Sequence, residues 1–474
     1  MSKNSETLRQ EKYVRMTTTP VEKLILKLAI PTIMSMLVTT LYNLADTFFV
    51  SSIGGKEGTY AIAAVSVSLS IMSLIQATGF FIGQGAANYI SRALGKQDTG
   101  KADEMAATGF VLAAGLGLLL MLIGEVFLEP IAKFLCAARK DKGLIAPTVQ
   151  YLRWIFVAAP FMTSAFAINN QLRFQGNAFY AMIGVVSGAV LNVGLDPLFI
   201  HVFGMGVQGA SAATAISQAV SFCILFLGTR HGDNLRIHPT HARISKENLH
   251  LIVQGGLPSL MRQGAAAISV MVLNRMAGLV GGADPTIGEA TLIAAFGLVN
   301  KIMMFLNNVV IGLGQGYQPV CGFNYGAGLY SRVRKAFWFL VRAVALWCIV
   351  VTVVVELFTP QVVGMFPDAE PRVRELAVTI LRLQCAMLTF NAFIVPSNMS
   401  QQTMGMMVPA STLALARQGL FMIPLAILLP EFFGLIGLEL AQPIGDLLTF
   451  ILAIILQSRV LRMLNQPDRT AEDA

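Results

Sequence analysis

Long apolar stretches recur along the whole chain and constrain its fold more than any other feature. Twelve of them have about the length, roughly 20 residues, that a helix needs to cross a bilayer. The predicted spans are residues 24–50, 60–83, 105–128, 144–168, 177–201, 208–229, 248–279, 288–314, 333–358, 372–396, 406–429 and 434–458. Because irregular backbone cannot face lipid, each span is expected to be helical. The sequence therefore predicts an all-α, polytopic membrane protein.

The composition agrees with a membrane location. Of the 474 residues, 55% are hydrophobic and only 13% are charged, whereas soluble domains are about 25% charged. The net charge of +8 would suit a nucleic-acid partner, but the basic residues lie between apolar runs, where membrane proteins place them. We therefore expect no nucleic-acid partner. The first twenty residues contain no apolar signal-peptide core, so the first span is expected to direct insertion.

Lysine and arginine in the connections predict the orientation. With the N-terminus inside, roughly 20 of them lie in inner segments and roughly 7 in outer ones, which favours cytoplasmic termini at both ends. One outer loop runs against this pattern, with Lys133, Arg139, Lys140 and Lys142.

The second half of the sequence repeats the first at an offset of about 230 residues. Gly83-Gln84-Gly85 matches Gly314-Gln315-Gly316, and Ala29-Ile30-Pro31 matches Gly256-Leu257-Pro258. Each copy has six spans, so both have the same orientation and their pseudo-twofold axis should follow the membrane normal. The predicted parts are an N-terminal tail at 1–20, a first lobe at 21–232, a linker at 233–247, a second lobe at 248–460 and a C-terminal tail at 461–474.

Asp46 lies within the first span, four residues after Tyr42 and on the same helix face. A charged side chain at the bilayer centre costs about 2.5–3.5 kcal/mol, so such residues usually face the protein interior. Burial penalises the charged form of a carboxylate, which suits Asp46 to taking up and releasing a proton. The alternative is a hydrated carboxylate near a helix end.

Asn192 and Asp196 share a face of the fifth span, and Thr214 lies on the sixth. With Asp46 they would form an oxygen-lined site for a shared proton or for a hard cation such as sodium. The alternative for Asn192 and Thr214 is hydrogen bonding between helices.

Charged residues in the second half are weaker candidates. They are expected to line the second lobe or to form buried pairs, and they are Arg262, Arg275, Lys301 and Asp446. Glu125 and Glu356 occupy equivalent repeat positions, and a structural or interfacial role is expected for them. Arg153 and Arg382 are a similar repeat pair, expected to extend to the membrane interface. The sequence has no Gly-x-x-x-x-Gly-Lys-[Ser/Thr] loop and no Cys/His cluster with metal-ligand spacing. We therefore expect no enzyme activity, and no cofactor besides a coupling proton or sodium ion.

Several motifs resemble bacterial members of the multidrug and toxic compound extrusion (MATE) family. Residues 29–50 are similar to the family's first helix, residues 191–200 to its fifth, and residues 206–214 to the start of its sixth. The most specific match is Gly312–Gly326, between the predicted eighth and ninth helices. The resemblance extends from residue 20 to residue 460.

This resemblance implies a V-shaped, twelve-helix exporter in the bacterial cytoplasmic (inner) membrane. It would expel amphipathic organic cations and drugs in exchange for protons or sodium ions, as a monomer surrounded by lipid. The implied coupling residues, and sodium ligands where sodium is the ion, are Asp46, Asn192, Asp196 and Thr214. The substrate is expected to contact Tyr42, Asn43, Asn169 and Gln315. The acidic residues that some members carry on helices seven and ten are missing, since those spans offer Arg262, Asn274, Arg275, Gln384 and Asn391.

Two other functions stay open. A related flippase for lipids or lipid-linked oligosaccharides would need a cationic cavity for phosphate, for which Arg262, Arg275 and Lys301 are available. A channel or receptor is less compatible with two matched six-span lobes, because alternating access uses that symmetry.

Overall fold

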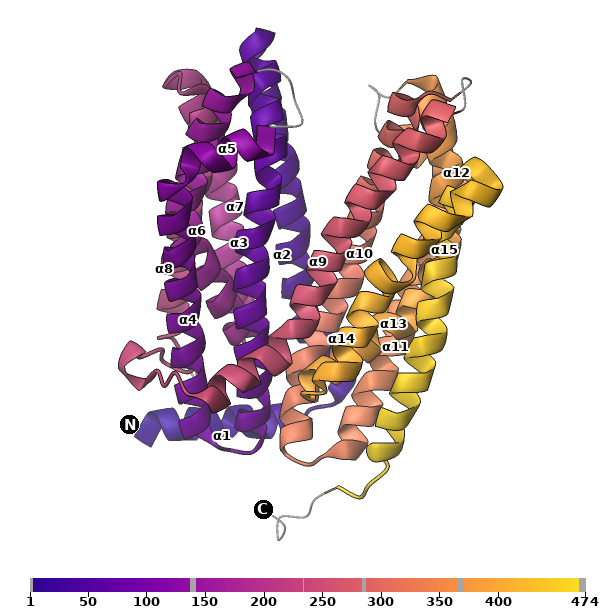
Figure 1. The fold of residues 1–474 in the computed structure, drawn as a ribbon. Helices are drawn as coiled ribbons and strands as arrows, with labels where there is room; N and C mark the ends of the chain where they lie inside the picture. Colours follow the sequence, from indigo (N-terminus) through magenta and orange to yellow (C-terminus); the bar gives the residue numbers. More distant parts are fainter. Residues whose placement is uncertain (1–2, 137–141, 233, 284–286, 365–369, 469–474) are drawn as a thin grey trace. The chain divides into compact units, whose positions relative to one another are not determined.

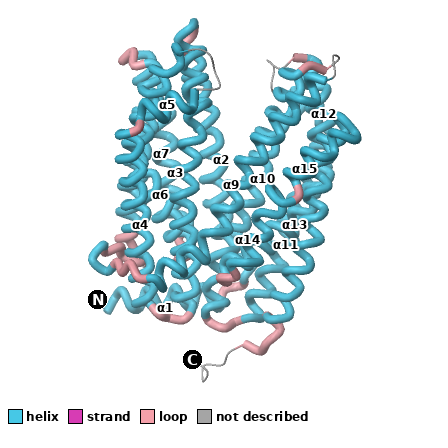
Figure 2. Tube along the Cα trace, in the orientation of Figure 1, coloured by secondary structure: helices cyan, strands magenta, loops and turns pink. Residues whose placement is uncertain are grey.

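The computed structural model describes residues 3–136, 142–232, 234–283, 287–364 and 370–468. Almost all of this described chain is helical and none of it is strand (Figure 2). The predicted all-α class is therefore confirmed.

The first half of the chain is a series of long helices. They are α1 (Lys3–Thr18), α2 (Val21–Ser51), α3 (Gly55–Gly95), α4 (Thr99–Val126), α5 (Leu128–Cys136), α6 (Ile145–Phe174), α7 (Ala178–Pro197), the π-helix η2 (Leu198–Val202) and α8 (Gly206–Gly228). The second half contains α9 (Lys246–Ala283), α10 (Glu289–Gly326), α11 (Tyr330–Gly364), α12 (Pro371–Met387), α13 (Asn391–Thr403), α14 (Met407–Leu415), the π-helix η5 (Ala416–Leu420) and α15 (Met422–Met463).

The described helices include 11 that are long and apolar enough to cross a membrane. The last, Met407–Met463, contains two predicted spans. It is interrupted at Gly434, whose φ of 55° is outside the helical region. Past this break the chain returns on itself, because a Cβ on Gly437 would lie 2.8 Å from the nitrogen of Pro430. The break therefore separates two spans and restores the predicted twelve.

The two Gly-Gln-Gly motifs lie inside helices, whereas the sequence placed them just after the second and eighth spans. Helix α3 continues through Gly83–Gly85 to Gly95, and α10 continues through Gly314–Gly316 to Gly326. These extensions are buried against protein, so they do not need the apolar surface by which a span is recognised. The match at Gly312–Gly326 is likewise the end of α10 and not a connection between helices.

The chain forms two compact units that exchange short segments. Unit 1 is Met1–Thr19 with Ile30–Gly256, and unit 2 is Pro20–Ala29 with Leu257–Ala474. The start of α2 therefore belongs to unit 2 and the start of α9 to unit 1. A glycine lets each exchanged segment pack closely against its unit. A Cβ on Gly85 would lie 2.9 Å from the carbonyl carbon of Ile252, and a Cβ on Gly316 would lie 2.5 Å from the nitrogen of Ala29. This exchange departs from the predicted division within residues 233–247.

The predicted linker is packed against unit 1. The Leu235 amide donates to Gln175 Oε1 at 2.8 Å, and the Arg243 amide donates to Thr108 Oγ1 at 3.0 Å. Leu235 itself is buried. The linker is thus an ordered part of the unit.

The predicted N-terminal tail is mostly the helix α1, which crosses the ends of the spanning helices of unit 1 (Figure 1). Arg9 forms an ion pair with Asp103 at 3.6 Å. Met16 is buried, next to the turn at Gly176. Polar pairing and apolar anchoring together fix α1 to this surface.

Matching ion pairs occur in the two units. Arg153 Nε lies 4.0 Å from Glu125 Oε2, and Arg382 Nε lies 3.6 Å from Glu356 Oε2. A structural or interfacial role was predicted for the two glutamates and an interfacial position for the two arginines, and the structure pairs each arginine with a glutamate. In the outer loop that ran against the charge pattern, Lys133 pairs with Glu129, and Arg139 and Lys140 lie outside the described residues.

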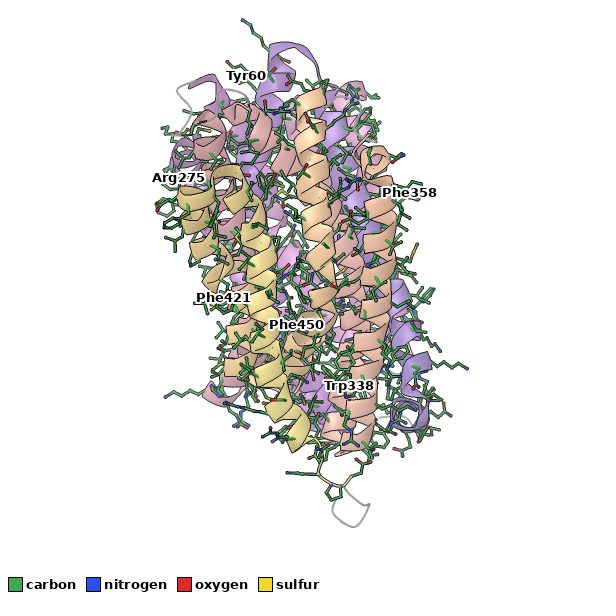
Figure 3. The ribbon with its side chains drawn as sticks, turned by 90° about the vertical axis from the view of Figure 1, so that its right-hand side faces the viewer. Tyr60, Arg275, Trp338, Phe358, Phe421 and Phe450 are labelled. Atoms are coloured by element: carbon green, nitrogen blue, oxygen red, sulfur yellow. The ribbon has the colours of Figure 1, made fainter. Side chains whose placement is uncertain are left out.

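Aromatic rings fill part of the unit 2 core. The Phe393 ring contacts those of Phe337, Trp338 and Phe450 at centroid distances of 5.8, 6.3 and 6.0 Å. Trp338 and Phe450 are on the side of unit 2 that faces the viewer in Figure 3. Helices α11, α13 and α15 are joined by this cluster.

Candidate functional site

Helices α7 and α8 hold the most deeply buried part of the predicted site, in unit 1. Small residues let them approach: a Cβ on Gly188 would lie 2.9 Å from the Cβ of Ser221. Ser221 Oγ also donates to the Gly184 carbonyl at 2.9 Å. Pro197, which has no N–H to donate, marks the change from α7 to the π-helix η2. The close contact and the helix change set the position of Asp196.

Asn192, Asp196 and Thr214 come together as predicted. Asn192 Nδ2 lies 3.3 Å from Asp196 Oδ1 and 3.4 Å from Thr214 Oγ1. Their exposed fractions are 1%, 0% and 5%. The Thr214 hydroxyl donates to the Ala210 carbonyl at 3.1 Å, so it acts as an acceptor toward Asn192. Helix–helix hydrogen bonding and a shared polar site therefore coexist at these residues.

Asp46 joins this group from α2. It is half-buried, as is Tyr42, one turn earlier, while Asn43 is exposed. Asp46 and Asp196 interact electrostatically, and the Tyr42 hydroxyl interacts with both carboxylates. Three predicted helices thus contribute to one acidic site.

Several buried oxygens of this site have no hydrogen-bond donor in the described part of the chain. Among the described residues, the buried side-chain atoms without a hydrogen-bond donor include Asp46 Oδ1, Asn192 Oδ1 and Asp196 Oδ2. A buried acceptor left without a donor costs about 1–3 kcal/mol, and more when charged. A proton would turn one carboxylate into a donor, and a hard cation would be coordinated by these oxygens. The arrangement is therefore chemically suited to either ion.

Tyr151 is a neighbour of the site that the sequence analysis missed. It is almost wholly buried on α6, and its hydroxyl donates to Met72 Sδ at 3.6 Å. It interacts electrostatically with Asp46, Tyr42 and Asp196. The available signal in the sequence was the Tyr151 hydroxyl inside an apolar span. Spacing on a helix face relates only residues of the same helix, so it could not connect Tyr151 on α6 to the other site residues.

Asn169 and Gln315 were predicted to contact substrate. Asn169 Nδ2 donates to the carbonyl of Ala181 at 3.0 Å, joining α6 to α7. In unit 2, Asn398 makes the corresponding bond to Ala410 at 2.7 Å. Gln315 is buried within α10. The structure therefore gives Asn169 a helix-joining contact that is repeated in both units.

The predicted cationic residues of unit 2 are dispersed in their contacts. Arg262 Nη1 lies 3.4 Å from Asn398 Oδ1. Arg275 and Lys301 are exposed, and Arg275 lies in the upper part of the unit in Figure 3. No described contact groups these three residues.

Asp446 belongs to a buried pair, which was one of its two predicted roles. Its Oδ1 accepts from Arg417 Nε and from Gln442 Nε2, each at 3.0 Å. Arg417 lies in the π-helix η5, where Ser269 donates to the Gln418 carbonyl. This carboxylate is charge-compensated, unlike the pair in unit 1.

Known proteins resemble the chain over nearly its full length. The family model described as MatE matches residues 31–198 and 258–428. Multidrug export protein MepA of Staphylococcus aureus strain N315 is 26% identical over 460 residues, covering 96% of this chain and 98% of the relative. The MepA protein of Staphylococcus haemolyticus strain JCSC1435 is also 26% identical, with 92% of each chain covered.

A solved structure has the same fold. It is the outward-facing conformation of a multidrug resistance MATE family transporter of the MOP superfamily, with a TM-score of 0.86 and 25% identity. The similarity covers 98% of this chain and 100% of that one. With helices that span a membrane in two repeated units and a family model matched in both, this chain belongs to the MatE family of multi-pass membrane transporters.

Proposed function

We propose that the protein is a secondary active multidrug exporter, which expels amphipathic organic cations in exchange for protons or sodium ions. The observation that carries the proposal is the pair of interacting carboxylates at Asp46 and Asp196, each of which has one buried oxygen, Asp46 Oδ1 or Asp196 Oδ2, without a donor among the described residues. The relatives named as multidrug export proteins support the substrate class. No chemical conversion of the substrate is needed.

Exchange follows from competition for negative charge. With no ion bound, two carboxylates in one buried site repel each other, and this state is costly. A proton or sodium ion relieves the repulsion, and so would an organic cation bound near the same charges. Because each cation weakens the binding of the other, the two are coupled reciprocally, as exchange requires.

Tyr42 and Asn43 are the proposed substrate contacts closest to the coupling site. Tyr42 is half-buried and Asn43 is exposed on the same helix. An aromatic face attracts an organic cation by about 0.5–2 kcal/mol, and the amide can bond to polar groups of the drug. Asn169 and Gln315 remain proposed substrate contacts.

The proposed setting is the bacterial cytoplasmic membrane, with both termini in the cytoplasm and the protein acting as a monomer among lipids. The excess of lysine and arginine in the predicted inner segments supports this orientation. A lipid or lipid-linked oligosaccharide flippase is the second candidate, supported by Arg262, Arg275 and Lys301 in unit 2.

The decisive experiment is dye efflux from liposomes that contain the purified protein. A proton gradient and a sodium gradient are imposed separately, and Asp46→Asn and Asp196→Asn are compared with the parent. Glu431→Gln, at an exposed acid in unit 2, is the control. We expect transport driven by one gradient, lost in both aspartate variants and kept in the control.

Full exchange by Asp46→Asn would show that Asp46 is not the coupling residue. Absence of dye movement under both gradients, with movement of a labelled lipid, would favour the flippase.

A further inference from the structure

One histidine lies at the end of the two helices that carry the acidic pair. Four of the five histidines lie between residues 231 and 250, and the fifth is His201 in the π-helix η2. Its Nε2 lies 2.9 Å from Ser52 Oγ, a contact between residues 149 positions apart in sequence. Ser52 follows α2, which carries Asp46, and His201 follows α7, which carries Asp196.

The hydrogen bonds fix which imidazole nitrogen can titrate. Ser52 Oγ donates its only proton to the Phe49 carbonyl at 2.6 Å. It must therefore accept from His201, so Nε2 carries a hydrogen. The acceptor nitrogen of the neutral ring is then Nδ1, which is the atom that gains and loses a proton. The bond to Ser52 is compatible with both charge states and keeps the ring in one orientation.

His201 is close to the site along both helices. It follows Asp196 by five residues and Ser52 follows Asp46 by six, which at 1.5 Å per residue is about 7 to 9 Å. The imidazole is exposed, whereas Asp196 is fully buried. His201 is thus an exposed imidazole at the end of the two helices that carry the acidic pair.

The π-helix is held firmly at this place. The Phe203 amide donates to the Leu198 carbonyl at 2.9 Å, which closes the wide turn. Helix α8 packs directly on it, since a Cβ on Gly209 would lie 2.8 Å from the carbonyl carbon of Phe199. Ile200 is in the apolar core with Val50 of α2. π-turns of this kind are frequent at functional sites.

Few other ionisable groups lie near this end of the neighbouring helices. They are Tyr42 and Asp46 of α2, Lys56, Glu57 and Tyr60 at the start of α3, and Asp196 of α7. Among them, only Asp46 and Asp196 combine a negative charge with burial in the proposed coupling site. Histidine ordinarily changes charge between about pH 5 and 8, so an imidazole can both take up and give a proton near neutral pH.

We propose that His201 is the proton-transfer residue between the solution at this end of unit 1 and the Asp46–Asp196 pair. Nδ1 takes a proton from the solution, and the imidazolium then passes that proton through hydrogen-bonded water to a carboxylate oxygen of the pair, which restores the neutral ring with hydrogen on Nε2. Release runs in the opposite direction. This inference rests on the proposed antiport with the proton as the coupling ion.

The test measures proton-driven dye exchange in liposomes while the pH at this end of the protein is varied. His201→Gln keeps a donor for Ser52 but cannot titrate, and His201→Ala removes both functions. We expect His201→Gln to slow exchange about tenfold or more near neutral pH and to flatten its pH profile. Added imidazole should restore the rate of His201→Ala. His250→Gln, at an exposed histidine of α9, is the matched control and should behave as the parent.

An unchanged pH profile in His201→Gln, with exchange still lost in Asp46→Asn, would overturn the proposal for His201 and leave the antiport intact. Exchange in the parent that follows only a sodium gradient would have the same meaning. Failure of the parent to exchange dye with either ion would overturn the proposed function as well.

Discussion

Asn192 makes both of its side-chain hydrogen bonds through its amide nitrogen. Its side-chain carbonyl oxygen is buried and has no donor among the described residues. The side chain therefore fixes the Asp196 carboxylate and adds an acceptor at the same time. Thr214 is the residue that orients this amide. The ion-binding power of the site consequently depends on a neutral hydroxyl as well as on the carboxylates.

Thr214→Val should weaken ion binding, because it removes the acceptor that orients Asn192 while keeping the side-chain shape. Loss of a hydrogen bond of about 1 kcal/mol corresponds to an approximately fivefold rise in the half-saturating ion concentration. The measurement is exchange rate against coupling-ion concentration. Thr214→Ser, which keeps the hydroxyl, should resemble the parent; equal behaviour of the two variants would contradict this role.

The Arg417–Asp446 pair predicts a different outcome. Asp446→Leu would leave Arg417 without its partner in a place where the two side chains are 19% and 5% exposed, and should destabilise the protein by about 3 kcal/mol. The double variant Arg417→Met with Asp446→Leu should recover most of that loss. Thermal unfolding in detergent measures both. A double variant no more stable than the single one would rule out charge pairing as the cause.

At the scale of elements, the apolar pattern predicted where helices cross the membrane but not where they end. Residues 84–95 of α3 include Gln84, Asn88 and Arg92, so their hydropathy is low although the helix continues. Gln84 bonds to Asn170, and Asn88 to the Gly255 carbonyl, inside the unit. The apolar pattern detects lipid-facing surface. It therefore does not detect a helical segment whose polar side chains form hydrogen bonds with other helices.

The same contrast explains the site. Asn192 and Asp196 were predicted together because four residues separate them on one helix. Arg417, in the π-helix η5, and Asp446, in α15, are 29 residues apart, and no spacing rule relates them. Sequence reasoning therefore grouped Asp46, Asn192, Asp196 and Thr214 but did not identify Arg417 as the partner of Asp446.

Gly85→Ala and Gly316→Ala should each destabilise the protein. Each added Cβ would fall within 3 Å of the backbone of the exchanged segment, at Ile252 or at Ala29, and overpacking of this kind costs about 1–3 kcal/mol. Gly115→Ala in α4, where nothing lies within 4 Å, is the control. Midpoints of thermal unfolding compare the three, and equal midpoints would contradict the packing argument.

For the whole molecule, the repeat conserves architecture but not chemistry. Both units contain the arginine–glutamate pair and the asparagine that joins two helices. The interacting, unpartnered carboxylate oxygens of Asp46 and Asp196 belong to unit 1, whereas Asp446 of unit 2 is neutralised by Arg417. The proposed coupling is accordingly asymmetric.

Asn169→Ala and Asn398→Ala test this view of the repeat. Each removes the same interhelical hydrogen bond, so we expect similar losses of stability, about 0.6–1 kcal/mol each. Drug affinity should distinguish them: a fall in affinity confined to Asn169→Ala would support its proposed substrate contact. Unequal stability with unchanged affinity would mean that the two bonds are not equivalent.

Because the two units exchange segments, the order of translation determines when each unit has all of its residues. Unit 1 includes residues up to Gly256, and unit 2 includes Pro20–Ala29. The first six spans can therefore leave the ribosome and enter the membrane with their unit still lacking a segment, until the start of α9 has been translated. Pro20–Ala29, the first segment of unit 2, is translated long before the other helices of that unit. A polypeptide divided at the linker would yield two fragments, neither of which contains a full unit.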